Sequence, residues 1–294
     1  MLWPKRFPSR FVLIAFGFVV ICLLAGRFTA TLAITSGHDD LGVVDVELVL
    51  AADVSGSMQP EELAIQRRGY AEAFRSRDVI EAIVHGGYGR VAVTYVEWAG
   101  KGAQSVIVPW TLIDSSEDAF ALADRLLEDT PRNMRRTSIS DAIRFSASLF
   151  QDNGYRGIRR VIDISGDGPN NHGGPVLRAR NEALAAGITI NGLPIMTMRS
   201  VPESVYDIDN LGKYYSKCVI GGPRAFMIPV HGWDEFPDAI RRKLVLELGR
   251  GDSLIEQAAF EGDVVMAEPV FAGEPTQCAM RTDWKDQRSR NDGT

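Results

Sequence analysis

Short apolar runs rich in β-branched residues alternate along the chain with segments whose apolar positions recur every three or four residues. The first run, residues 43–52, ends in five consecutive apolar residues, which is typical of a strand buried on both faces. Further strands are predicted over 90–98, 104–110, 160–165, 188–195 and 225–230. Helices are predicted over 60–74, up to 84, 116–127, 139–150, 176–186 and 236–248, and over part of 201–215.

This alternation predicts an α/β domain with a doubly wound, mostly parallel sheet that helices cover on both faces. One pair of strands is an exception. Only a short glycine-containing link separates residues 90–98 from 104–110, so these two strands are predicted to form an antiparallel hairpin. The pattern decays after residue 249, and residues 251–294 are predicted to be a C-terminal extension that is partly disordered.

The first 33 residues have the pattern of an export signal. Three basic residues precede an uncharged apolar run at 11–26, and small residues follow it. That run is short for a membrane span of about 20 residues. A cleavable signal peptide ending near Ala30 or Ala33 is therefore favoured over an uncleaved N-terminal membrane anchor. Both alternatives predict a periplasmic or secreted domain that meets the membrane only through residues 1–33, if they stay attached.

Composition and charge restrict the partners. Apolar residues make up 45% of the chain and charged residues 24%, as in ordinary globular proteins. The formal net charge of −6 excludes nucleic acid as the expected partner. Cys218 and Cys278 are an even pair in a chain expected to be exported, and they form either a disulfide or two separate thiols.

Oxygen-bearing side chains stand at alternate positions where the first predicted strand ends. Asp53, Ser55 and Ser57 follow the apolar run directly. Because side chains of an extended chain alternate between its two faces, these three groups are expected to point the same way. Carboxylate and hydroxyl oxygens are hard ligands that suit Mg²⁺, or Mn²⁺ or Ca²⁺.

Two more oxygen groups are expected at the same edge of the sheet. Asp167 follows the predicted strand 160–165, and Thr137 begins the helix that leads into that strand. In doubly wound sheets, binding sites form outside the carboxyl ends of the strands. We therefore expect five side chains to meet around a divalent cation: Asp53, Ser55, Ser57, Thr137 and Asp167. Since two carboxylates only balance the charge of the ion, it would retain affinity for one more anionic oxygen.

The sequence Asp-Val-Ser-Gly-Ser at 53–57, Thr137, and Gly-Asp-Gly at 166–168 carry a family resemblance. Together they resemble the metal-ion-dependent adhesion site of the von Willebrand factor type A domain, and the resemblance covers roughly residues 43–250. More narrowly, Ser-Gly-Asp-Gly-Pro-Asn-Asn at 165–171 and Cys-Val-Ile-Gly-Gly-Pro at 218–223 resemble a bacterial group of exported domains of unknown function.

The resemblance implies a six-stranded sheet with one antiparallel edge strand. It implies that Ser55 and Ser57 bind Mg²⁺ directly, that Thr137 binds directly or through water, and that Asp53 and Asp167 act mostly through water. An Asp or Glu of a protein partner would complete the coordination. The expected function is therefore metal-dependent protein binding, in adhesion or assembly, and not catalysis.

Two positions depart from the family pattern. Gly166 stands where many members have Thr, and Arg136 stands where Gly is common. Neither change removes a ligand, but each could reshape its loop. Arg135, Arg136 and Asn170 are candidates for a rim that contacts an acidic partner. The alternatives are a solvated loop for the two arginines and an ordinary Asn- and Gly-rich turn for Asn170.

Three other interpretations compete with the adhesion site. The first is a simple strand-ending turn in which Asp53 caps a helix. The second is an exported scaffold whose ion only stabilises loops. The third is a phosphatase of the haloacid dehalogenase type, with Asp53 as nucleophile and Asp167 holding Mg²⁺. That family requires an acid where Ser55 stands and a lysine before its last motif, yet residues 102–212 contain no lysine. The phosphatase is therefore the least favoured.

Overall fold

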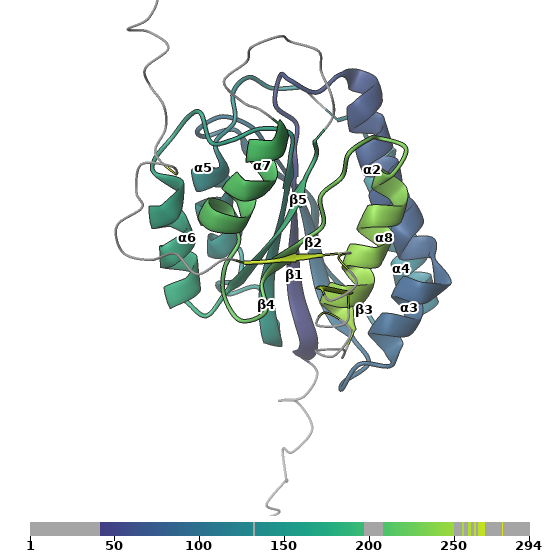
Figure 1. Ribbon diagram of the computed structural model, residues 1–294. Coiled ribbons are helices and arrows are strands. Elements are labelled where there is room, and N and C mark those ends of the chain that lie inside the picture. Colours follow the sequence, from purple (N-terminus) through teal and green to yellow (C-terminus); the bar gives the residue numbers. More distant parts are fainter. Residues whose placement is uncertain are drawn as a thin grey trace, which may run out of the picture. The chain divides into compact units, whose positions relative to one another are not determined.

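A mixed sheet of seven strands forms the centre of the described chain, in the order β3-β2-β1-β4-β5-β6-β7 (Figure 1). The computed structural model describes residues 42–131, 133–196 and 208–249, and further residues at 255, 258–259, 262, 264–267 and 278. The predicted signal or anchor at 1–33 lies outside them. The strands are β1 (Val43–Asp53), β2 (Val91–Trp98), β3 (Gln104–Ile113), β4 (Arg156–Gly166), β5 (Thr189–Pro194), β6 (Phe226–Met227) and β7 (Val265–Met266).

The sheet is parallel in its centre and antiparallel at both edges. β1 pairs in parallel with β2 and β4, and β5 continues the parallel arrangement to β6. The α/β class and the antiparallel β2–β3 pair are confirmed. The sheet has seven strands and not the predicted six, because β7 pairs antiparallel with β6 at the other edge. A strand of two residues leaves no periodic pattern in the sequence. It lies in the predicted C-terminal extension, which therefore contributes to the sheet.

Helices cover both faces of the sheet, as predicted (Figure 1). One layer contains α2 (Pro60–Arg75), α3 (Arg77–Val84), α4 (Ser116–Glu128) and α8 (Phe236–Leu248), and the other contains α5 (Ile139–Ser148), α6 (Val176–Ala185), α7 (Ile208–Tyr214) and the π-helix η1 (Tyr215–Val219). The part of the predicted helical segment before residue 208 lies outside the described residues. None of the helices described is long and apolar enough to span a bilayer.

Side chains of β1 alternate between two core clusters, one under each helical layer. Val46, Leu48 and Leu50 belong to the cluster beneath α2, α3, α4 and α8. Val49 and Ala51 belong to the cluster beneath α5, α6 and η1. Burial on both faces explains why the second half of this strand, residues 48–52, is apolar without interruption. It also fixes β1 in the middle of the sheet, so that the residues after it emerge at the carboxyl edge.

Three charged side chains are buried between α8 and the sheet. Lys243 Nζ of α8 lies 2.7 Å from Asp163 Oδ1 of β4, and it also pairs with Glu247, one turn along α8. Asn191 Nδ2 of β5 donates to Glu247 Oε1 at 2.8 Å. One lysine thus faces two carboxyl groups. Burial and then the charge of Asp163 raise the pKa of Glu247 to about 7.

Substitution of Glu247 by glutamine should remove a pH dependence of stability. The folded state keeps the Glu247 proton at pH values where the unfolded chain has released it. Stability is therefore lost as the pH rises from about 4.5 to about 7. The loss is on the order of 3 kcal/mol. Glu247→Gln cannot ionise, so its free energy of unfolding should exceed that of the wild type at pH 8 and match it near pH 4.5.

Urea unfolding of both proteins at pH 4.5 and pH 8 measures this difference. The other carboxyl groups contribute equally to the pH dependence of both proteins, so their contribution cancels in the comparison. An equal change of stability with pH in the two proteins would contradict the assignment.

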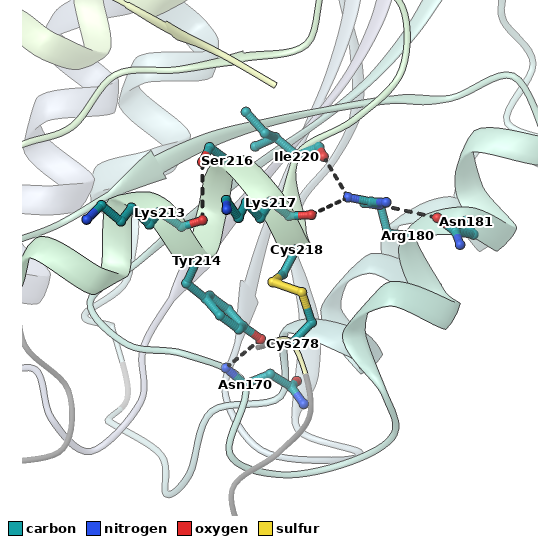
Figure 2. Close-up of a disulfide and its surroundings, with 10 residues drawn as sticks. All are labelled: Asn170, Arg180, Asn181, Lys213, Tyr214, Ser216, Lys217, Cys218, Ile220 and Cys278. Atoms are coloured by element: carbon teal, nitrogen blue, oxygen red, sulfur yellow. Dashed lines mark hydrogen bonds between the residues drawn. A yellow bond between two sulfur atoms is a disulfide. The ribbon is translucent and has the colours of Figure 1, made fainter. Parts of the chain in front are cut away.

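A disulfide between Cys218 and Cys278 joins the C-terminal extension to η1 (Figure 2). The Cα atoms are 5.6 Å apart and the residues are separated by 60 positions. A crosslink closing a loop of that length stabilises a fold by about 4 kcal/mol in the chain-entropy model. Next to it, Arg180 Nη1 of α6 donates to the carbonyl oxygens of Lys217 and Ile220, at 2.7 and 3.5 Å. η1 is therefore fastened on two sides.

Candidate metal centre

Asp53 ends β1 with its carboxyl group fully buried. Asp53 Oδ1 accepts a hydrogen bond from the backbone N–H of Ser55 at 2.7 Å. The Asp53 carbonyl oxygen accepts another from Gln66 Nε2 of α2, at 3.0 Å. The turn after β1 and the helix that follows thus hold this residue from both sides.

A row of oxygen atoms leads from the Asp53 turn to Asp167. Ser55 Oγ lies 3.1 Å from Ser57 Oγ, and Ser57 Oγ donates to Asp167 Oδ1 at 2.7 Å. Asp167 comes into reach because β1 and β4 are neighbouring parallel strands whose carboxyl ends meet. Ser55 is buried, Asp167 is partly buried and Ser57 is exposed. Four of the five predicted ligands therefore form one group that opens to solvent at Ser57.

Thr137, the fifth predicted ligand, lies in the loop between α4 and α5. Met134 N of this loop donates to the carbonyl oxygen of Val54 at 2.8 Å, and Ser138 N donates to that of Ala99 at 2.8 Å. These bonds hold the loop against the residues that follow β1 and β2. The Thr137 side chain is buried there. The structure thus brings all three predicted segments to the carboxyl edge of the sheet.

Two asparagines fasten the Thr137 loop to the Asp167 loop. Asn171 Oδ1 accepts from Thr137 N at 2.9 Å, and Asn171 N donates to the Thr137 carbonyl oxygen at 2.9 Å. Asn170 Oδ1 accepts from Ser140 N at 3.0 Å, and Asn170 Nδ2 donates to the Gly174 carbonyl oxygen at 3.1 Å. The rim position predicted for Asn170 is therefore wrong: its side chain is buried and already engaged in holding the loops.

The structure shows how the chain accommodates its two departures from the family pattern, Arg136 and Gly166. Arg136 has a φ of 68°, in the left-handed region that favours glycine. This conformation costs a non-glycine residue about 1 kcal/mol. Arg136 and its neighbour Arg135 are both exposed, directly before Thr137. At Gly166, an added Cβ would lie 2.9 Å from Asp53 Oδ2 and 3.0 Å from the Tyr215 hydroxyl oxygen. The space for a larger residue is thus already filled.

The electrostatics of Asp53 fit a cation. Asp53 Oδ2 is buried and has no hydrogen-bond partner within the described part of the chain. Burial and then the charge of Asp167 raise the pKa of the Asp53 carboxyl well above its usual range, while hydrogen bonds from Ser55 and from the Asp167 backbone lower it. A nearby divalent cation would offset both the burial and the repulsion between the two carboxylates.

The donor set fits a hard cation as well. Carboxylate and hydroxyl oxygens are the ligands that Mg²⁺ and Ca²⁺ take in proteins. Across residues 42–131, 133–196 and 208–249 and the few described beyond them, no three His, Cys, Asp or Glu side chains cluster closely enough to hold a metal. A cation at this edge would thus depend on the hydroxyls of Ser55, Ser57 and Thr137 together with the carboxylates.

Sequence reasoning missed the roles of three residues that shape this site, although Asn171 stands in the motif at 165–171. Gln66 fixes the Asp53 backbone, Asn171 fixes the Thr137 loop, and the Tyr215 hydroxyl lies next to Gly166. None of them stands at a spacing that marks it. The one available signal was Gly166 itself, because a glycine in place of a larger residue indicates that another group occupies its space.

The mostly parallel sheet, covered by helices on both faces, has the arrangement that the resemblance to the von Willebrand factor type A domain implied. The chain belongs to the DUF1194 family, described as "Protein of unknown function", whose model matches residues 43–252. No curated protein matches the sequence significantly.

Solved structures share the fold at low sequence identity. The pilus adhesin SpaC from Lactobacillus rhamnosus GG, in its open conformation, superposes with a TM-score of 0.51 and 13% identity, over 70% of this chain and 30% of that one. Proximal thread matrix protein 1 from the mussel byssus, in crystal form 2, gives 0.50 and 14%, over 69% and 47%. A von Willebrand factor type A protein from Catenulispora acidiphila gives 0.47 and 16%, over 70% and 43%. This chain therefore spans less than half the length of each of these proteins.

Replacing Asp53 with asparagine should separate metal binding from folding. Asparagine keeps an oxygen for the Ser55 N–H but removes the buried charge, so the metal-free variant should melt at or above the wild-type temperature. Mg²⁺ at about 100 times its dissociation constant should raise the wild-type melting temperature by roughly 5 to 10 °C. Asp53→Asn should lose that rise.

Differential scanning calorimetry with Mg²⁺ and with EDTA checks both expectations. Asp124→Asn, which changes an exposed aspartate of α4, serves as the control and should keep the Mg²⁺ effect. An unchanged Mg²⁺ effect in Asp53→Asn would exclude this carboxylate from the site.

Proposed function

We propose that this domain binds a protein partner through a divalent cation that bridges to an Asp or Glu of that partner. The observation that carries the proposal is the buried, unpartnered Asp53 Oδ2 at one end of an oxygen group that reaches solvent at Ser57. Ser55, Ser57 and Thr137 would hold Mg²⁺, or Mn²⁺ or Ca²⁺, with Asp53 and Asp167 balancing its charge. When bound, the cation supplies a coordination position that one more anionic oxygen completes.

Two exposed arginines support an acidic partner. Arg135 and Arg136 directly precede Thr137 and lie on the solvent side of its loop. The chain carries a formal net charge of −6, so a local pair of positive charges would be needed to draw a carboxylate toward this edge. Their contribution would be mainly to the rate of association, and it would weaken with salt.

The fold likeness to a pilus adhesin supports a binding role in adhesion or assembly over a catalytic one. The location is also a proposal. The basic, apolar and small residues within 1–33 support export, and the Cys218–Cys278 disulfide is the kind of bond that persists in an oxidising compartment. We therefore place the domain in the periplasm or outside the cell.

A capture experiment tests the bridging cation. The immobilised domain should retain a partner from the native cell envelope in Mg²⁺ and release it in EDTA. Ser55→Ala should retain at least tenfold less, because one direct ligand is lost. Ser146→Ala removes another buried serine hydroxyl, from α5, and should capture like the wild type.

The alternatives predict other results. Capture that neither EDTA nor Ser55→Ala reduces would overturn the bridge. A scaffold with a stabilising ion would show the Mg²⁺ melting shift without any metal-dependent partner. Phosphatase turnover that Asp53→Asn abolishes would establish the enzyme instead.

A further inference from the structure

Tyr215 brings an unassigned hydroxyl to the buried end of the metal centre. It begins η1, and its side chain is fully buried. Its hydroxyl has no hydrogen-bond partner among the residues that the structure describes, and neither has Asp53 Oδ2. Both oxygens lie within 3.0 Å of the point where a Cβ at Gly166 would stand. A buried donor and a buried acceptor, each unpartnered, therefore border the same small space.

Two glycines create the room for this tyrosine. A Cβ at Gly192 of β5 would lie 2.8 Å from Tyr215 Cδ1, and one at Gly166 of β4 would lie 3.0 Å from its hydroxyl oxygen. β4 and β5 are adjacent parallel strands. The tyrosine thus passes over both strands at positions without a side chain and reaches the end of β1. A path kept clear at two separate positions indicates a defined place for the hydroxyl.

The segment that carries Tyr215 is held at both ends. The preceding Tyr214 accepts a hydrogen bond at its hydroxyl from Asn170 N, at 3.3 Å (Figure 2). The disulfide of Cys218 and the two bonds from Arg180 hold the other end of η1. Figure 2 shows these contacts along one short stretch of helix. Tyr215 is therefore held at a fixed position relative to the Asp167 loop. Short π-helical turns are frequent at functional sites.

We propose that Tyr215 is a positioning residue of the metal centre, whose hydroxyl donates to Asp53 Oδ2 when a cation is bound and holds that carboxylate in its orientation. The inference rests on the metal site of the proposed function, but not on the identity of any partner. A phenol keeps its proton at neutral pH, so it acts toward a carboxylate as a donor.

Tyr215→Phe removes only the hydroxyl. Isothermal titration with Mg²⁺ alone should show a dissociation constant at least about tenfold higher than that of the wild type, because a hydrogen bond to a charged group is lost. The melting temperature of the metal-free variant should stay level or rise, because an unpartnered buried hydroxyl has been removed. A purely structural role predicts the reverse: a lower metal-free melting temperature and an unchanged Mg²⁺ dissociation constant.

Tyr95→Phe is the matched control. Tyr95 of β2 is also a fully buried tyrosine, but it belongs to the core cluster on the other face of the sheet. Its substitution should leave the Mg²⁺ dissociation constant unchanged.

A second pair of variants tests the same space by adding a methyl group at a glycine. Gly166→Ala places a methyl group within 3.0 Å of both Asp53 Oδ2 and the Tyr215 hydroxyl oxygen and should also weaken Mg²⁺ binding about tenfold or more. Gly212→Ala of α7 makes only ordinary contacts, 3.6 Å from Met196 Sδ and 3.8 Å from Met227 Cε, and should bind Mg²⁺ like the wild type. An unchanged dissociation constant in Gly166→Ala would contradict the inference even if Tyr215→Phe failed to fold.

The outcomes separate this inference from the proposed function. A wild-type chain that binds no Mg²⁺ overturns both. Mg²⁺ binding without metal-dependent capture overturns only the bridge to a partner. Mg²⁺ binding that Asp53→Asn abolishes and Tyr215→Phe leaves unchanged overturns only the role of Tyr215.

Discussion

The burial of the Asp53 carboxylate is the constraint on which the rest of the site depends. A charged group at the end of an apolar strand is unfavourable unless other groups compensate for it. The Ser55 N–H satisfies one of its oxygens, and the other stays unpartnered beside the Tyr215 hydroxyl within the described residues. Repulsion from the negative charge of Asp167 makes the ionised form of the Asp53 carboxyl group still less favourable. A divalent cation is the compensating group that this arrangement of oxygens fits.

The chain compensates its buried acids in two different ways along one strand. Asp163, in the middle of β4, pairs with Lys243 from α8, so that a side chain of the protein supplies the positive charge. Asp167, just beyond the end of β4, and Asp53 beside it face the open edge of the sheet instead. The first arrangement secures a helix to the sheet, whereas in the proposed metal centre a cation from solution would supply the positive charge. Only the second can respond to a metal or to a partner.

The grouping of Asp53, Ser55, Ser57 and Asp167 at one edge was predictable because it depends on periodicity and topology. The apolar run before Asp53 and the strand before Asp167 locate two strand ends, and a parallel sheet brings such ends together. Tyr215 was not predictable, because it reaches the site across β5 from a π-helix that has no periodic signal of its own. Asn170 was misassigned since its role depends on loop geometry, which composition does not encode. β7 was missed because two residues cannot display a period.

The most direct measurement is a crystal structure of the domain grown with Mn²⁺, with the metal located by its anomalous scattering. The account predicts one peak about 2.1 to 2.4 Å from the hydroxyl oxygens of Ser55 and Ser57. A water molecule, or a carboxylate from a neighbouring molecule, should occupy the position that faces solvent. Saturating Mn²⁺ with no peak at this edge, or with the metal bound only elsewhere, would contradict the account.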